Sequence, residues 1–223
     1  MGDAVGQMLA SAVGIAISPM PLVAVILMLA TPKGRSNGLA FTAGWVVALT
    51  ALVTVVVLVG SGLDTGTAEP TWGWWLKLAF GTLFVLLGLK QWRGRPRAGR
   101  VQPPPKWMQA LDRFTPARAA GLAAALVAVN PKNLVLAVGG AVSIATSDAS
   151  GGGKAVAAAL MVLIGSLCTL LPLSVYLFGG DRSVRVLGEW KAWMATHNAA
   201  IMMVVLVVLG AKYIGDAVSG LTS

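Results

Sequence analysis

The hydrophobic residues of this chain are grouped into six long stretches, which are separated by short polar segments. A helix needs about 20 mostly apolar residues to cross a bilayer, and every stretch reaches that length. Because the apolar residues run continuously instead of alternating with polar ones, the pattern favours membrane-spanning helices over transmembrane β-strands. We therefore expect an all-α polytopic membrane protein with six transmembrane helices. The predicted spans are residues 5–30, 38–61, 73–92, 118–144, 154–178 and 197–218.

The overall composition supports this pattern. Hydrophobic residues make up 57% of the 223 residues and charged residues 11%, whereas a soluble domain is about 45–50% apolar and about 25% charged. These values exclude a water-soluble globule and a disordered chain. The single cysteine, Cys168, excludes an internal disulfide, and with the single histidine, His197, it argues against a zinc site or a catalytic triad. We expect neither enzymatic activity nor a cofactor.

Basic residues are concentrated in one central, proline-rich segment, residues 93–118, where Asp112 is the single acidic residue. The positive-inside rule places this segment in the cytoplasm of a plasma (inner) membrane protein, and the alternation of six spans then places both termini outside the cytoplasm. Amphipathic patches predict an interfacial helix in this segment and another in residues 183–194, although loop packing would explain the same patches. The basic residues of the central segment are Arg93, Arg95, Arg97, Arg100, Lys106, Arg113 and Arg118.

The two halves of the chain resemble each other. Residues 14–25 align without gaps with residues 126–137, and LLGLK at 86–90 matches VLGAK at 208–212. Each half has three spans, and because three is an odd number the second half enters the membrane from the opposite side. This is an inverted-topology repeat, the architecture of many secondary transporters. The predicted units are a first repeat at 1–92, a basic linker at 93–117 and a second repeat at 118–223.

Prolines lie near the middle of the first and fourth predicted spans. Proline removes a backbone donor and clashes with the preceding turn, so Pro19, Pro21 and Pro131 should break these helices. Broken backbone within a membrane is tolerated only where it faces protein or water, and its free polar groups can bind a substrate. A packing kink is the alternative, but the paired motifs favour one central site. Its candidate residues are Ser18, Pro19, Met20, Pro21, Asn130, Pro131, Lys132 and Asn133.

Lys132 is the most informative of these candidates, because it lies near the middle of the predicted span 118–144. A charge at that depth is expensive and marks a functional site by default. No acidic residue lies near the centre of any predicted span, so we expect Lys132 to face a polar cavity and attract an anionic group, or to titrate. Hydrogen bonding to carbonyls freed by the break is the alternative. The secondary site candidates, all in the fifth span, are Ser166, Cys168, Thr169 and Pro172.

Three weaker predictions concern the remaining spans. Pro172 should kink the fifth span. Lys212, near a span end, should extend its side chain toward the interface. Gly88 and Gly210, which occupy matching places in the two halves, should allow close contact between helices.

The proline motifs and the six-span pattern resemble those of the LysE superfamily of exporters. The sequence NPKNL at 130–134 is similar to the asparagine-proline-lysine signature of that superfamily, and SPMP at 18–21 occupies the place of its first-half signature. Within the superfamily the chain looks most like the actinobacterial GAP/Sap group, the glycolipid- and sulfolipid-addressing proteins. The ISPMPL and VNPKNL motifs, the FxxGW run at 41–45 and the basic, proline-rich centre support that match. The resemblance covers essentially the whole chain.

This resemblance implies a plasma-membrane protein that helps to move cell-envelope glycolipids outward, and it assigns no catalytic residue. Our leading hypothesis is a transporter that works by alternating access or through a lipid groove, with Lys132 holding a negative group. One alternative is a proton-coupled exporter of a small solute such as an amino acid or an ion. Another is a non-transporting scaffold for a larger lipid exporter. The candidate partners are membrane lipids, such an exporter and a second copy of the chain; nucleic acid is not expected.

Overall fold

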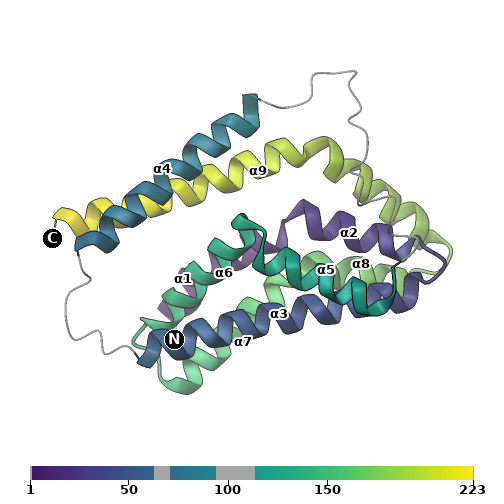
Figure 1. The fold of residues 1–223 in the computed structure, drawn as a ribbon, viewed down its shortest axis with the longest axis horizontal. Coiled ribbons are helices and arrows are strands. Elements are labelled where there is room, and N and C mark those ends of the chain that lie inside the picture. The colour runs from purple at the N-terminus through teal and green to yellow at the C-terminus, as the bar shows by residue number, and fades with distance from the viewer. Residues whose placement is uncertain (1, 63–70, 94–113, 223) are drawn as a thin grey trace. The chain divides into compact units, whose positions relative to one another are not determined.

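A computed structural model describes residues 2–62, 71–93 and 114–222 (Figure 1). In these ranges every regular element is an α-helix, so the predicted all-α class is confirmed. The interfacial helix predicted in the central basic segment falls largely outside the described residues. The helices are α1 (Gly2–Ala16), α2 (Pro19–Leu29), α3 (Gly34–Gly62), α4 (Thr71–Arg93), α5 (Pro116–Ala128), α6 (Pro131–Ala145), α7 (Gly151–Gly165), α8 (Leu167–Phe178) and α9 (Arg182–Thr222).

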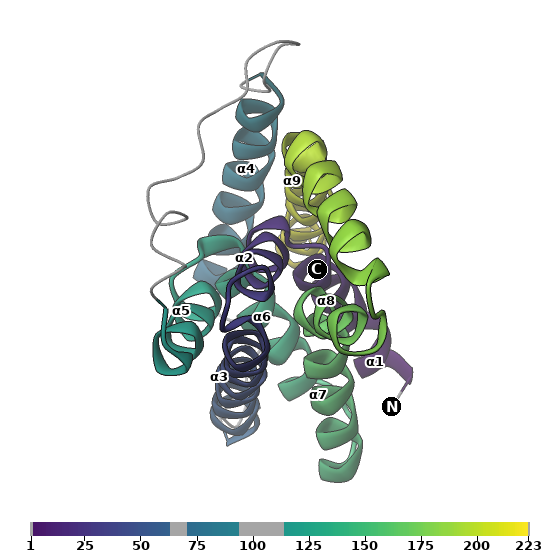
Figure 2. The same ribbon diagram turned by 90° about the vertical axis from the view of Figure 1, so that its right-hand side faces the viewer.

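The chain divides into two compact units. The main unit comprises residues 1–63 and 104–194, and the α4/α9 unit comprises residues 64–103 and 195–223. In the main unit, α3 packs along α5 and α6, while α7 and α8 pack against α1 and α2; both ribbon views show α3 beside α5 (Figures 1 and 2). Each compact unit takes segments from both predicted repeats.

Several described helices are long and apolar enough to cross a membrane. Three ranges qualify by themselves: Met8–Leu29, which runs across the break between α1 and α2, Gly34–Ser61 and Ala199–Thr222. The bent pairs α5–α6 and α7–α8 raise the number to five if each pair forms one span. The apolar part described in α4 is shorter, Gly81–Lys90. The described residues therefore hold three to five membrane-capable helices, and the six-span count remains a prediction.

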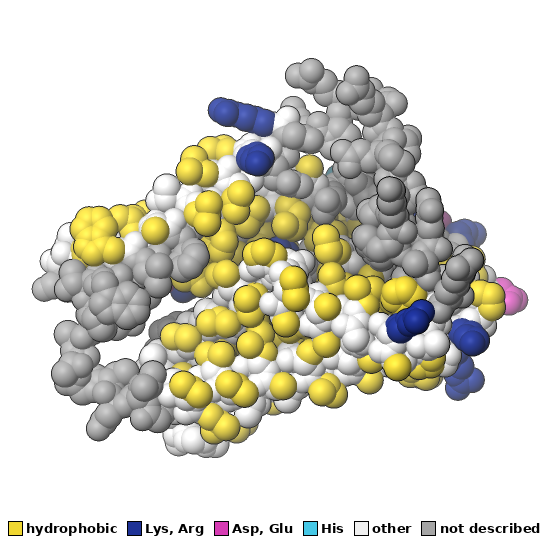
Figure 3. Space-filling model, in the orientation of Figure 1, with side chains coloured by type: hydrophobic (Ala, Val, Ile, Leu, Met, Phe, Trp, Pro, Cys, Tyr) yellow, Lys and Arg dark blue, Asp and Glu magenta, His cyan; other side chains and the backbone are white. Residues whose placement is uncertain are grey.

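The outward faces of these helices carry large apolar side chains. Val47, Val55 and Leu58 on α3 are all more than half exposed. On the face shown in Figure 3, hydrophobic side chains cover the lengths of the main-unit helices, and Lys and Arg side chains lie mostly toward the edges of the view, with one group at its right-hand end. An apolar flank with charges at the helix ends is the distribution that a bilayer requires.

The helix breaks predicted at the two proline motifs are confirmed. Helix α1 stops before Ser18 and α2 starts at Pro19; likewise α5 stops before Asn130 and α6 starts at Pro131. Proline is well tolerated at a first helical position, where its missing N–H has no helical partner to lose. The cap residues have nearly the same backbone angles, φ −75° and ψ 114° at Ser18, and φ −72° and ψ 111° at Asn130. The two motifs thus begin their helices in the same way.

Two local predictions about the other helices are wrong. The fifth span bends by 57° between α7 and α8, at Ser166, while Pro172 lies inside α8. Proline leaves the carbonyl four residues earlier without its helical partner, here that of Cys168, which lies inside α8, so the ring does not account for the bend at Ser166. The segment 183–194 is also no separate interfacial helix. It is continuous with the last span in α9, because no proline interrupts the chain there.

Candidate functional site

The structure brings the two helix breaks together inside the main unit. The Ser18 Oγ donates a hydrogen bond to Asn133 Oδ1 at 3.0 Å, although the two residues are 115 positions apart. Lys132 Nζ in turn donates to the same Ser18 Oγ at 3.5 Å. All three residues are buried, and Lys132 is only 5% exposed. The Ser18 hydroxyl at the first break therefore links the Asn133 amide and the Lys132 ammonium, both of which follow the second break.

A second set of contacts completes this group. Asn130 Oδ1 accepts a hydrogen bond from the backbone N–H of Lys132 at 3.1 Å and so caps α6, while its Nδ2 lies 4.0 Å from Met20 Sδ. Asn133 Nδ2 donates to the carbonyl of Leu126 at 3.3 Å, a carbonyl in the last turn of α5. We call Ser18, Met20, Asn130, Lys132 and Asn133 the break cluster.

The charge balance of the break cluster is unusual. In the described part of the chain, no Asp or Glu oxygen lies within ion-pair distance of Lys132. A buried ammonium normally needs a counter-charge as well as hydrogen bonds, because burial removes its hydration. Among the described residues, the acceptor for its ammonium is one hydroxyl at the limit of hydrogen-bond distance. The geometry therefore suits an additional, negatively charged ligand.

The prolines of the motifs shape the breaks without contributing polar groups. Pro19 and Pro21 are buried in the main unit, whereas Pro131 is exposed at the start of α6. Their effect on the site is through the backbone that they interrupt.

The secondary candidates lie at the third break, between α7 and α8. Ser166, Cys168 and Thr169 are buried, as is Pro172 inside α8. The Thr169 hydroxyl donates to the carbonyl of Ser166 at 3.0 Å, and the Cys168 thiol donates to that of Gly165 at 3.4 Å. Helix α8 packs against α2, the helix that begins at the first break.

Comparison with known proteins decides the family. The family described as Sap, sulfolipid-1-addressing protein, matches residues 8–219, a range that contains both proline motifs and the whole break cluster. The chain belongs to this family. No curated protein and no solved structure is similar enough to count as a match. The predicted membership of the GAP/Sap group is thus confirmed, and with its apolar helices the chain is a Sap-family membrane protein.

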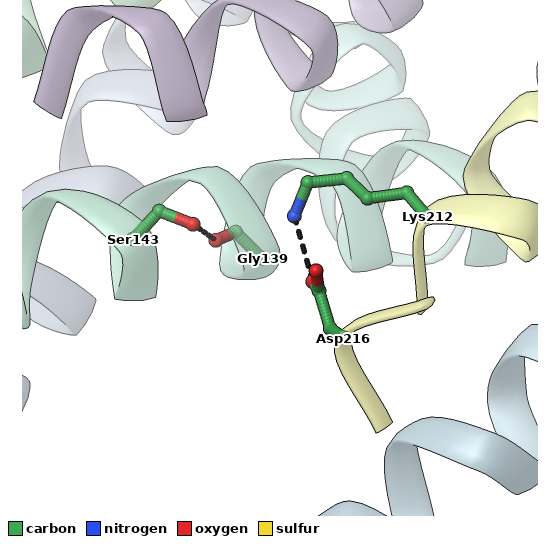
Figure 4. A network of polar contacts seen from close by, with 4 residues as sticks. All are labelled: Gly139, Ser143, Lys212 and Asp216. Atoms are coloured by element: carbon green, nitrogen blue, oxygen red, sulfur yellow. Dashed lines mark hydrogen bonds and ion pairs between the residues drawn. The ribbon is translucent and has the colours of Figure 1, made fainter. Parts of the chain in front are cut away.

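Two other polar contacts of this Sap-family protein are satisfied within single helices (Figure 4). In α9, Lys212 Nζ forms an ion pair with Asp216 Oδ2 at 3.0 Å, one turn further on. In α6, Ser143 Oγ donates to the carbonyl of Gly139 at 3.0 Å. Lys212 thus has a local counter-charge, whereas Lys132 has none among the described residues. Within the described part of the chain, no three His, Cys, Asp or Glu side chains come together as a metal site would need.

The Sap-family structure also contains a groove that the sequence did not reveal. It lies in the main unit between α3 and the bent pair α7–α8, and its volume is about 850 Å³. Lys154 at one end donates hydrogen bonds to the carbonyl of Ala145 and to Ser61 Oγ. Two features of the sequence could have indicated it: the hydroxyls of Thr50 and Thr54, which lie one turn apart in an uncharged part of the second span, and the lysine at the start of the fifth span. The lining residues are Val46, Thr50, Val53, Thr54, Val57, Leu58, Ser61, Ala149, Gly151, Lys154, Ala155, Ala158, Ala159, Val162, Leu163, Ser166 and Leu170.

Proposed function

We propose that this Sap-family protein is a transporter of the LysE type that moves anionic cell-envelope lipids across the plasma membrane. The observation that carries this proposal is Lys132, a buried cation at the meeting point of two helix breaks. The family description names a sulfolipid, a lipid class with an anionic, sulfur-containing headgroup. Such a headgroup would supply the counter-charge that the described residues do not provide.

The contacts within the break cluster support an inverted repeat. When residues 14–25 are aligned with 126–137, Ser18 corresponds to Asn130 and Met20 corresponds to Lys132. Ser18 contacts Lys132, and Asn130 contacts Met20. If the two halves of the repeat change places, the Ser18–Lys132 contact becomes the Asn130–Met20 contact, and the reverse. A two-fold axis through the cluster would produce this reciprocity, and a substrate site at such an axis is typical of inverted-repeat transporters.

The α4/α9 unit supports the same repeat independently. The alignment of 86–90 with 208–212 pairs Gly88 with Gly210 and, by extension, Gly81 with Met203. A Cβ added to Gly210 would lie 2.7 Å from the Gly81 carbonyl oxygen, and one added to Gly88 would lie 3.3 Å from that of Met203. If the two halves change places, the Gly210–Gly81 contact becomes the Gly88–Met203 contact, and the reverse. This agreement supports α4 and the end of α9 as matching third and sixth spans.

The break cluster offers a simple binding step. The Ser18 hydroxyl is shared between Lys132 and Asn133, so an anionic oxygen that approaches Lys132 would replace a weak partner with a charged one. Charge-assisted hydrogen bonds are about twice as strong as neutral ones. The amides of Asn130 and Asn133 could then bind neighbouring polar groups. Because the helices are already interrupted here, the two halves could rock about the bound headgroup, as alternating access requires.

Transport by the purified full-length protein in liposomes tests this proposal. A fluorescent sulfated glycolipid serves as the probe, with its transbilayer movement followed by chemical quenching in the presence and absence of a pH gradient. Lys132→Met should abolish movement while the protein stays folded, since removing an unpaired buried charge is neutral or favourable for stability. Lys90→Met, at an exposed position on α4, is the matched control and should move the lipid like the wild type.

The same experiment separates the alternatives. Transport by Lys132→Met at the wild-type rate would contradict the site assignment. Uptake of radiolabelled amino acids or ions, without lipid movement, would instead indicate a small-solute exporter. If the wild type moves neither class of substrate and co-purifies with a larger lipid exporter, the protein is a scaffold.

A further inference from the structure

The groove between α3 and the bent pair α7–α8, which we call the α3/α7 groove, has the dimensions of a lipid chain. Its lining on α3 extends from Val46 to Ser61, a length of about 22 Å at 1.5 Å per residue. This is most of the ~30 Å thickness of a bilayer's hydrocarbon core. On α7 the lining includes Ala155, Ala158 and Ala159, whose small side chains leave the space open. The walls are apolar over most of this length.

The two ends of the groove differ from its walls. At one end Lys154, which has no Asp or Glu partner within ion-pair distance among the described residues, contacts the Ser61 hydroxyl at 3.5 Å. At the other end Ser166 is fully buried, and its hydroxyl has no hydrogen-bond partner within the described residues. Ser166 is also the cap residue of α8, which packs against α2, the helix that begins at the first break. The groove therefore runs from a cation at its mouth to the bend between α7 and α8.

We propose that the α3/α7 groove binds an acyl chain of a membrane lipid whose sulfate or phosphate headgroup contacts Lys154. The inference rests on the proposed function, since it supplies the path by which a lipid would reach the break cluster. Charge complementarity selects an anionic headgroup over a neutral one. The apolar walls favour a hydrocarbon chain, because such a chain has no polar groups that need partners along the groove.

Photolabelling tests the occupant of the groove directly. The full-length protein is placed in vesicles that contain phosphatidylglycerol with a photoreactive group on its acyl chain, and the adducts are mapped by peptide mass spectrometry. We expect adducts on the groove faces of α3 and α7. Ala158→Trp fills the groove and should reduce this labelling about tenfold, whereas Val156→Trp is the matched control, because Val156 is exposed on α7 outside the lining. Unchanged labelling in Ala158→Trp would overturn the proposal.

The headgroup contact has its own test. Labelling by the phosphatidylglycerol probe is compared with labelling by a phosphatidylcholine probe carrying the same chain. Lys154→Gln should reduce the preference for the anionic probe about tenfold, because it removes a charged hydrogen-bond donor, and Lys154→Arg should retain the preference. Equal labelling by both probes in the wild type would overturn the headgroup assignment. Crosslinks between copies through groove residues, in place of lipid adducts, would assign the groove to self-association.

The two proposals can fail separately, because labelling measures binding without transport. A labelled groove in a protein that moves no lipid would contradict the proposed function alone. Lipid transport that depends on Lys132 but leaves the groove unlabelled would contradict the groove alone.

Discussion

Lys132 and Lys212 lie in apolar helices of the same chain, but their surroundings differ. Lys132 is buried, and its ammonium donates to the Ser18 hydroxyl at a helix break. Lys212 is partly exposed, pairs with Asp216 in its own helix, and lies 5.7 Å from the Tyr213 ring centre. A cation with a counter-charge in its own helix has its charge neutralised locally, whereas a buried cation without one can still bind an anion. The comparison favours Lys132 over Lys212 as the lysine that would hold the proposed anionic ligand.

The regions around these lysines are built in equally different ways. In the main unit the broken helices meet through side-chain hydrogen bonds, such as that from Ser18 to Asn133. In the α4/α9 unit, unbroken helices approach through glycines, and Gly81 and Gly210 bring backbone against backbone. Polar contacts of the first kind can be exchanged for a ligand, whereas contacts of the second kind only hold helices together. This difference predicts separate effects of mutation.

The largest effect on stability should come from the glycine contact. In Gly210→Leu the new Cβ would lie 2.6 Å from the Val85 side chain and 2.7 Å from the Gly81 carbonyl oxygen, so α4 and α9 must separate. We expect a loss of about 3 kcal/mol in the free energy of unfolding, measured by denaturation in detergent. Gly215→Leu is the matched control, because nothing lies within 4 Å of its Cβ position. Equal losses in both variants would contradict the close helix contact.

An intermediate effect, on lipid transport, should follow from giving Lys132 a carboxylate partner like the one that Lys212 has. Ser18→Asp places a carboxylate where the hydroxyl now accepts from Lys132 at 3.5 Å. The new ion pair would compete with an anionic headgroup, so lipid transport should fall about tenfold while the protein remains folded. Ser18→Ala, which removes the hydroxyl without adding charge, should retain more transport than Ser18→Asp. The reverse order in the liposome assay would argue against an anionic substrate at Lys132.

The smallest effect, on both stability and lipid transport, is expected from a substitution of Lys212. Lys212→Gln breaks a partly exposed pair between neighbouring turns of one helix, and such pairs contribute about 0.3–0.5 kcal/mol. The unfolding free energy should therefore change little, and lipid transport should stay at the wild-type rate. A loss of transport as large as that of Lys132→Met would remove the distinction between the two lysines.

Features that depend on local chemistry were predictable from the sequence. The breaks at Ser18 and Asn130 follow from the prolines after them, and the Sap-family motifs around them are contiguous in the chain. The kink predicted at Pro172 was wrong: the bend lies earlier in the span, at Ser166, where the chain has no proline to mark a break. The continuity of α9 was missed because an amphipathic patch has the same pattern whether its helix stops or continues.

The sequence by itself determined that the chain is a helical membrane protein, where two of its helices break, and which buried lysine to suspect, because hydropathy and proline geometry act within a few residues. Only the tertiary structure decided that Ser18 meets Lys132 across 114 positions. It also showed that no carboxylate among the described residues forms an ion pair with Lys132, and that α3 and α7 leave a groove between them. These features depend on which distant side chains pack together, and hydrophobic patterning along the chain does not specify that choice.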